Sequence, residues 1–209
     1  MKRLILFSFV ILLMLCNMQA QELKPIKLNP PDKERGLPFM QALVVRASVR
    51  EWSEEKLSLQ DLSDLLWAAN GVNRPDEGKR TASSAMNAQD IDLYVFMEEG
   101  VYLYDAFKKM LNPVISGDYR SLTGVTAAPV GLVLVSDISR FRAGDETLKL
   151  NWAAIDAGIV SQNISVFCAA TGLVTRPRAG FDHEKVKETL GLKDTQHVLL
   201  NHPVGYRKE

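Results

Sequence analysis

The run Leu150–Thr171, LNWAAIDAGIVSQNISVFCAAT, is the longest helix candidate in the chain and decides how the other elements can be arranged. Gly172 follows it directly, as is typical of a helix C-terminus. Small residues recur along it at Ala153, Ala157 and Gly158, and they let another backbone approach closely. Composition leaves open whether that neighbour belongs to the same subunit or to a second copy. The run therefore predicts one long central helix.

Three shorter helices are predicted around it. Apolar residues at roughly helical spacing predict a helix over Leu37–Val45. Ser58, with Asp61 three residues later, is typical of a helix N-terminus and predicts an amphipathic helix that ends near Asn70. A further short helix is expected over His183–Leu190.

The strand candidates show no regular alternation with the helices. Ile91–Met97 and Val101–Tyr104 flank a connection that contains Gly100, which predicts a β-hairpin. Pro129–Val135 is a continuous apolar run and predicts a buried strand, and His197–Leu200 predicts another. Because no βαβ repeat appears, the predicted class is α+β.

Composition excludes several kinds of protein. The chain has 209 residues, is 46% hydrophobic and 24% charged, and carries 25 basic and 25 acidic residues. These values are typical of a single globular domain and give no electrostatic footprint for nucleic acid. The sequence has no Gly-x-Ser-x-Gly motif and no glycine-rich phosphate loop of the standard kinds. The three histidines lack zinc-site spacing, so no metal is expected: His183, His197 and His202.

The N-terminal segment resembles an export signal. Lys2 and Arg3 precede an apolar run, Leu4–Cys16, and Ala20 lies before a polar continuation. This pattern predicts a signal peptide over residues 1–20, since the run is too short to cross a bilayer. The alternatives are an uncleaved anchor or a lipoprotein, but Leu15 is bulky where a small residue normally precedes a lipidated cysteine. The expected location is outside the cytoplasm, in the periplasm, with only transient membrane contact.

Residues 21–36 follow as a leader, and residues 37–209 are expected to form the folded domain. The leader contains Pro25, Pro30 and Pro31, the composition of an extended segment that need not fold compactly. Without residues 1–20 the chain has 23 basic and 25 acidic residues, and Cys168 is its only cysteine. An internal disulfide and a multi-cysteine metal site are thereby excluded, and Cys168 is interpreted as a buried, inert thiol.

Arg46, Ser48 and Arg50 form the most informative polar cluster. If this segment is extended, alternate residues face one way, and two guanidinium groups converge with a hydroxyl. Arginine donates paired hydrogen bonds to phosphate oxygens, so the cluster is suited to one phosphate. Taken alone, the same residues are more typical of a solvated basic loop than of a phosphate site.

Six short blocks, read in order, resemble the nitroreductase-like FMN enzymes. The blocks are Arg-x-Ser-x-Arg at 46–50, Ser-Ala-Met-Asn-Ala-Gln at 84–89, Asp-Ala-Gly-x-x-x-Gln-Asn at 156–163, Gly-Leu at 172–173, Gly-Phe-Asp at 180–182 and Pro-Val-Gly-Tyr at 203–206. Within that family the chain is most similar to the branch that includes peptide azoline oxidases, because of the tract Arg80–Ala85 and the hairpin ending Gly100–Asp105. The resemblance implies an α+β fold with a mixed or antiparallel sheet flanked by helices. It also implies an intertwined homodimer with one FMN at each end of the interface.

The resemblance also assigns roles at the phosphate end of the flavin. Arg46 and Ser48 match residues that hold the phosphate. Arg50 matches a basic residue that reaches the ribityl chain or the pyrimidine ring, where a positive charge stabilises the anionic reduced flavin. Arg207 or Lys208 would complete the phosphate site.

At the ring end, Asn87 matches an asparagine that contacts the isoalloxazine, with Gln89 near it. The stretch Arg178, Ala179 and Gly180 matches a segment whose backbone lies along the flavin and donates an amide hydrogen bond near its reactive nitrogen. Gly180 would permit that close approach. The resemblance identifies no catalytic side chain.

The expected function is therefore that of an FMN-dependent oxidoreductase that works by a ping-pong cycle. The donor would be NAD(P)H or an organic substrate, either a small molecule or derived from a peptide. The alternative is a flavin- or ligand-binding domain of the same fold without turnover. That alternative is motivated by Asp90 and Ile91, which stand where many simpler nitroreductases have Pro-Trp, and by the short C-terminus.

Overall fold

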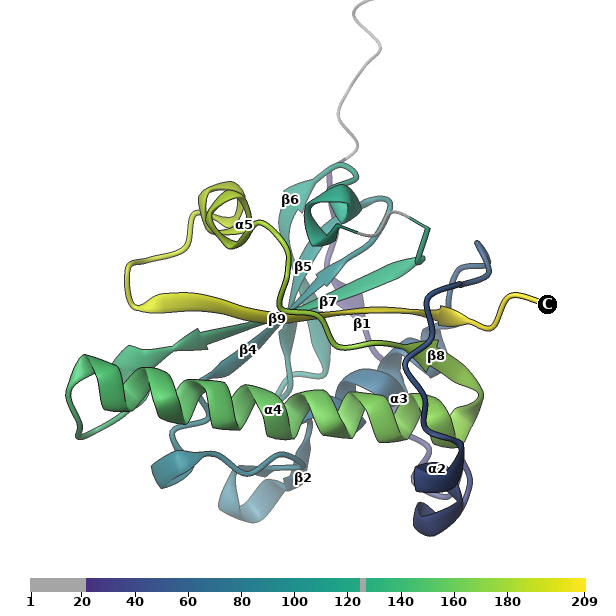
Figure 1. Cartoon of the computed structure of the whole chain (residues 1–209), viewed down its shortest axis with the longest axis horizontal. Coiled ribbons are helices and arrows are strands. Elements are labelled where there is room, and N and C mark those ends of the chain that lie inside the picture. Colours follow the sequence, from purple (N-terminus) through teal and green to yellow (C-terminus); the bar gives the residue numbers. More distant parts are fainter. Residues whose placement is uncertain (1–21, 125–126) are drawn as a thin grey trace, which may run out of the picture.

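The computed structural model describes residues 22–124 and 127–209, and its centre is a seven-stranded sheet in which every neighbouring pair of strands is antiparallel (Figure 1). The strand order is β1-β6-β5-β4-β7-β9-β8. The strands of this sheet are β1 (Ile26–Lys27), β4 (Ile91–Phe96), β5 (Gly100–Asp105), β6 (Met110–Ser116), β7 (Val130–Asp137), β8 (Leu173–Thr175) and β9 (Gln196–Tyr206). A separate hairpin joins β2 (Val72–Arg74) to β3 (Lys79–Arg80). The predicted α+β class is confirmed, and the predicted signal peptide lies outside the described residues.

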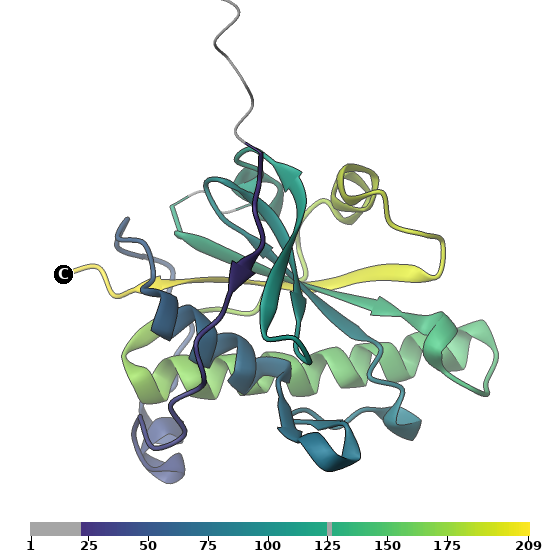
Figure 2. The ribbon, with the colours of Figure 1, turned by 180° about the vertical axis from the view of Figure 1, so that it is seen from behind.

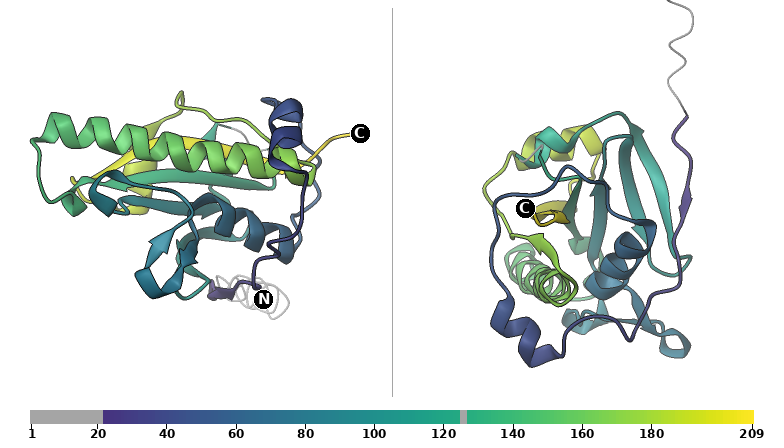
Figure 3. Two further views of the ribbon diagram at one scale, coloured as in Figure 1. Left: turned by 90° about the horizontal axis from the view of Figure 1, so that it is seen from below. Right: turned by 90° about the vertical axis from the view of Figure 1, so that its right-hand side faces the viewer.

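The long predicted helix is α4 (Glu146–Thr171), which runs roughly parallel to β9 and packs against one face of the sheet (Figures 1 and 3). It begins four residues earlier than predicted because Asp145 caps it, accepting a hydrogen bond of 2.8 Å from the amide of Leu148. It ends at Gly172, whose φ of 81° is the left-handed conformation expected of that cap. The helix is long and apolar enough to cross a membrane, but one side of it is buried in the core of this domain.

Both faces of the sheet are covered, which explains why its central strands are apolar throughout. Along β4, Leu93 and Val95 pack with α3 (Leu59–Asn70) and α4, whereas Tyr94 and Phe96 pack on the opposite side with α5 (His183–Leu190). Successive side chains of a strand point to opposite faces, so both sets must be apolar.

Most predicted elements are confirmed. The helix α2 (Phe39–Val45), the hairpin of β4 and β5, and α5 lie within two residues of their predicted bounds. Ser58 caps α3 as expected, since its side chain accepts a hydrogen bond from the amide of Asp61. The strand predicted over His197–Leu200 continues as β9 to Tyr206, and β6 was not predicted.

The leader is extended but tied to the domain (Figure 2). Its strand β1 pairs with β6, and Leu28 is buried. Further along, the amide of Asp32 donates to Asp64 at 2.8 Å, and Arg35 forms ion pairs of 2.7 Å with both Asp61 and Asp64 of α3. Since Asp64 is almost fully buried, these contacts hold the leader against the domain rather than leave it free.

The helix α2 projects near the C-terminal end of α4, to which the amide of Leu37 donates a hydrogen bond (Figure 1). Most of its apolar side chains remain exposed, including Phe39 at 65%, Met40 at 70% and Val44 at 85%. An apolar surface that the subunit does not cover is typical of a contact with another molecule.

Candidate functional site

The segment 46–50 is extended and lies beside β8. Ser48 pairs with Thr175 as an isolated parallel bridge, and the amide of Val49 donates to the carbonyl of Thr175 at 3.0 Å. The side chains of this segment lie along two neighbouring openings. Ala47 lines a small cleft over the C-terminal part of α4, Ser48 and Arg50 line a second hollow, and Val49 borders both.

That second hollow, which we call the basic hollow, has a volume of about 280 Å³ and lies between segments from the two ends of the domain sequence. It is lined by Ser48, Val49, Arg50, Glu51, Arg207 and Lys208. An isolated bridge between Trp52 and Arg207 brings the two segments together. The structure thus places Ser48, Arg50 and Arg207 in one hollow, although no local pattern links residues so far apart in the chain.

Arg46 does not line the basic hollow. It caps the C-terminus of α2, where its amide donates to the carbonyl of Ala42, and its side chain is exposed.

Arg176 is a further basic residue near this site, and it was not among the predicted site residues. Its Nε atom is buried and has no hydrogen-bond partner among the described residues. Burial, together with the positive charges of Arg178 and Arg50, lowers the pKa of Arg176. A buried donor without an acceptor costs about 1–3 kcal/mol, and clustered like charges repel, so this cluster is suited to a bound anion.

The segment after Arg176 presents backbone amides. The carbonyl and the amide of Arg178 both bond to Asn201 of β9, and its guanidinium donates to the carbonyl of Thr123 at 2.6 Å. These bonds fix the exposed residues Ala179 and Gly180, whose own amides donate to no acceptor in the described part of the chain. Around Gly180, no described atom would lie within 4 Å of an added Cβ, so a ligand can approach it closely.

Asn87 and Gln89 lie in a separate loop, residues 84–89, against the N-terminal half of α4 (Figure 3). The amide of Gln89 donates to Ser84 Oγ, and its side-chain amide bonds to Arg80 and to the carbonyl of Gly78. The side chain of Gln89 is therefore held by the β2–β3 hairpin.

The loop and the basic hollow lie at different points along α4. Asp156 contacts the loop, and the basic segment adjoins β8 just beyond Thr171, which is about 22 Å farther along the helix axis at the usual rise per residue. An elongated ligand with an anionic end would be needed to reach toward both.

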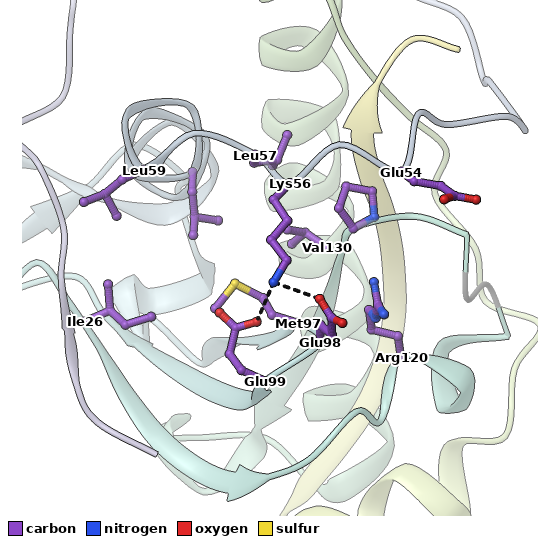
Figure 4. Close-up of a pocket in the computed structure, with 12 residues that line it drawn as sticks. Ile26, Glu54, Lys56, Leu57, Leu59, Met97, Glu98, Glu99, Arg120 and Val130 are labelled. Atoms are coloured by element: carbon purple, nitrogen blue, oxygen red, sulfur yellow. Dashed lines mark ion pairs between the residues drawn. The ribbon is translucent and has the colours of Figure 1, made fainter. Parts of the chain in front are cut away.

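A second candidate site is a pocket of about 180 Å³ on another side of the domain (Figure 4). Ile26, Leu59 and Met97 are among the apolar residues around it. At its mouth Lys56 pairs with Glu98 at 2.8 Å and with Glu99 at 4.0 Å, so these charges neutralise one another. The basic residues among the described lining of this pocket are both paired, since Arg120 forms an ion pair with Asp118, so the pocket is less suited to an anion than the basic hollow.

Comparison with known proteins identifies the family. The sequence profile of the Nitroreductase family matches residues 43–206. A protein of Methanocaldococcus jannaschii that is named as a nitroreductase is 26% identical over 198 residues, covering 88% of this chain and 98% of its own. A crystal structure from Ralstonia eutropha, also named as a nitroreductase, superposes with a TM-score of 0.85 at 33% identity and covers 90% of this chain and 92% of its own. A chain of the Escherichia coli microcin synthetase complex McbBCD, with truncated pro-MccB17 bound, shares the fold, with a TM-score of 0.68 at 18% identity, covering 93% and 82% of the two chains. The chain therefore belongs to the nitroreductase family.

Proposed function

We propose that this protein is an FMN-dependent oxidoreductase in which the flavin phosphate binds at the basic hollow. The observation that carries the proposal is that Ser48, Arg50 and Arg207 line one hollow. Arg176, whose buried Nε has no partner among the described residues, lies near enough to Arg50 for their charges to repel. A dianionic phosphate would satisfy these donors and relieve the repulsion between the guanidinium groups. The family membership adds to this argument, since FMN is the cofactor that the resemblance implies.

The chain's own groups fit the remaining parts of the cofactor. The amides of Ala179 and Gly180, which donate to no described acceptor, are available as hydrogen-bond donors toward a ring. Asn87 is exposed on a fixed loop. Arg50 lines the basic hollow, and its positive charge would lie toward the polar end of the ring system. Bound FMN supplies the group that takes a hydride from one substrate and passes it to the next.

The proposed donor is NAD(P)H or an organic substrate. The finer resemblance to azoline oxidases favours a peptide-derived substrate among the organic ones. The fold shared with a chain of the microcin synthetase complex is compatible with this choice but contributes only architecture at 18% identity. No catalytic side chain is assigned, because water can supply and accept the protons.

We further propose that the active form is a homodimer. The apolar surface of α2 and the exposed face of α4, where Ile155 is 60% exposed, would be covered by a second copy. Gly158 on that face costs helix stability without relieving any contact in its own subunit, since no described atom lies within 4 Å of an added Cβ. A closely packed partner helix would account for it.

The proposed location is outside the cytoplasm, on the basis of the signal-like residues 1–20. Cell fractionation with detection of the N-terminus of the exported form would test it. Retention of the full-length chain in the cytoplasm would contradict it.

The visible spectrum of the purified protein tests the proposed function. A yellow protein that is bleached anaerobically by NADH, NADPH or an organic donor is the expected result. A protein that cannot be loaded with FMN would contradict the assignment of the basic hollow. A yellow protein that no donor bleaches would favour the rival function, a flavin-binding domain without turnover.

A further inference from the structure

The loop 84–89 is held in a conformation that its residues do not favour. Met86, Asn87 and Gln89 have φ values of 53°, 52° and 49°. Left-handed backbone costs roughly 1–2 kcal/mol for a residue other than glycine, although asparagine tolerates it better. Such strain persists only where surrounding contacts enforce it, and the proposed flavin contact Asn87 lies in the middle of the strained stretch.

Asp156 of α4 is one of the contacts that enforce it, beside the bonds that hold Gln89. Its carboxylate oxygens lie 3.1 and 2.8 Å from the amide of Ala85, at the start of the loop. Asp156 is only 3% exposed, so the bond is shielded from water. The loop is thereby fastened to the central helix through one buried carboxylate.

A second buried carboxyl group, Asp90, follows the loop directly and faces Asp156. It is fully buried, one of its oxygens accepts a hydrogen bond from Ser136 Oγ, and the other, Oδ1, meets no donor among the described residues. Burial and the neighbouring carboxylate of Asp156 both raise the pKa of Asp90, which marks the two acids as close neighbours. Two carboxyl groups can bond to each other only if one of them carries a proton. Because both oxygens of Asp156 face the Ala85 amide, the proton belongs on Oδ1 of Asp90.

The surrounding charges do not neutralise this pair. Arg140 is the cation that interacts with Asp90, but its guanidinium is already paired with Asp92 and lies 3.9 Å from Asp137. His197 lies opposite Ser136 in the neighbouring strand β9. The described contacts therefore leave a shared proton as the means by which both carboxyl groups remain buried.

We propose that Asp90 and Asp156 share one proton and act together as positioning residues, so that the ionisation of the pair controls how loop 84–89 holds the flavin. The expected effect on flavin binding rests on the proposed function, whereas the shared proton itself does not. With the proton present, Asp156 is free to hold Ala85. Without that proton, the two buried negative charges repel each other, and the bond between Asp156 and the amide of Ala85 weakens.

Burial and the neighbouring Asp156 raise the pKa of Asp90 to about 7. The transition is therefore expected near neutral pH. The affinity for FMN should be highest in mildly acidic solution and fall as the pH rises past 7.

Asp90→Asn provides a sharp test, because an asparagine imitates the protonated acid. Its NH₂ can donate to Asp156 while its oxygen accepts from Ser136. We would measure the FMN dissociation constant by fluorescence quenching from about pH 6 to pH 9. We would measure the urea midpoint of the flavin-free protein from about pH 4 to pH 7, where the raised pKa of Asp90 makes the native state lose stability as the pH rises. The wild type should lose FMN affinity above neutral pH by up to about tenfold per pH unit relative to D90N, in which the loss is absent. The FMN phosphate titrates near pH 6 with either protein, so comparison with D90N removes its effect on the measured affinities.

Two further variants complete the experiment. Asp156→Asn should also abolish the pH dependence, because it removes one of the two charges. Asp64→Asn is the matched control: Asp64 is equally buried but paired with Arg35, and this variant should keep the wild-type pH dependence. A difference in urea midpoint between wild type and D90N that does not change with pH would overturn the shared proton. A urea difference that changes with pH, beside an FMN affinity difference that does not, would overturn the positioning role. Failure to bind FMN at every pH would refute the proposed function, whereas the urea profiles would still test the pair.

Discussion

Ser161 Oγ of α4 lies 2.7 Å from Nε2 of His202 in β9, and both side chains are buried. The other ring nitrogen, Nδ1, lies 3.2 Å from Thr175 Oγ1, whose proton goes to the carbonyl of Pro203 at 2.8 Å. Thr175 can therefore only accept from His202, so the proton lies on Nδ1 and Ser161 donates to Nε2. A neutral histidine thus joins the central helix to the strand that ends at the basic hollow.

Ser161→Ala should lower the free energy of unfolding by about 1–3 kcal/mol, because it leaves the buried Nε2 of His202 without a donor. Urea denaturation measures the loss. Ser139→Ala is the control, since Ser139 is exposed and its hydroxyl bonds only to the nearby Asp137. Equal losses in the two variants would argue against a buried hydrogen bond at His202.

His202 and Asp90 should shape the pH dependence of stability in opposite directions. Burial lowers the pKa of His202 to about 3, so as the pH falls below 6.5 the unfolded chain takes up a proton that the native state excludes, and stability is lost. Asp90 has its pKa raised from 3.8 to about 7, so its contribution is lost as the pH rises across that interval. Each slope is at most about 1.4 kcal/mol per pH unit, and the two oppose each other between about pH 4 and pH 6.5.

Single variants should reveal the two slopes. In this window Asp90→Asn should become more stable with rising pH, and His202→Asn less stable, while the wild type changes little. Urea midpoints at several pH values measure all three. A wild-type slope that neither substitution alters would show that other groups dominate.

Arg176→Gln should weaken FMN binding by about tenfold or more, since it removes a charge-assisted bond worth about 1.5–3 kcal/mol. In the flavin-free protein the same change should leave stability unchanged or slightly raised, because it relieves repulsion from Arg178 and Arg50. Fluorescence titration and urea denaturation measure the two effects. Arg142→Gln, at an exposed position, should alter neither. A similar loss of affinity in both variants would indicate an effect of net charge rather than of the site.

The elements that sequence predicted best are those with local signals. Ser58 and Asp61 mark the start of α3, and Gly172 marks the end of α4, because a cap is formed by residues within one turn. The strand β9 was predicted too short because Asn201, His202 and Pro203 suggest its end, whereas tertiary partners in β7 and β8 extend it to Tyr206.

Contacts between distant segments could not be predicted in this way. Arg176 becomes a site residue only because it lies near Arg50, which belongs to a far earlier segment. The proline-rich leader gave no sign that Arg35 would pair with Asp64. Resemblance to a family, by contrast, selected Arg46 and Ser48 for the phosphate, completed by Arg207 or Lys208, and Arg50 for the ribityl chain or the pyrimidine ring. Ser48, Arg50, Arg207 and Lys208 line the same hollow, whereas Arg46 does not.

Arg35→Gln should destabilise the protein by about 1–3 kcal/mol, because it leaves the buried carboxylate of Asp64 without its cation. Lys56→Gln is the matched control, since Lys56 pairs with Glu98 in solvent and an exposed pair contributes at most about 1 kcal/mol. Thermal or urea unfolding compares them. If the two variants behaved alike, the leader would not be held by a buried ion pair.

Gly158→Ala should act in opposite directions on the subunit and on the proposed dimer. Alanine favours a helix over glycine by up to about 1 kcal/mol, and its Cβ meets no described atom within 4 Å in the same subunit, so the isolated subunit should gain stability. If a second copy packs closely on this face, the added methyl group overfills the contact, which typically costs about 1–3 kcal/mol and raises the dimer dissociation constant about fivefold or more. Sedimentation equilibrium measures that constant, and Glu188→Ala, on the exposed surface of α5 across the sheet, should leave it unchanged. A dissociation constant that Gly158→Ala leaves unchanged, in a subunit made more stable, would mean that the partner helix does not meet α4 at Gly158.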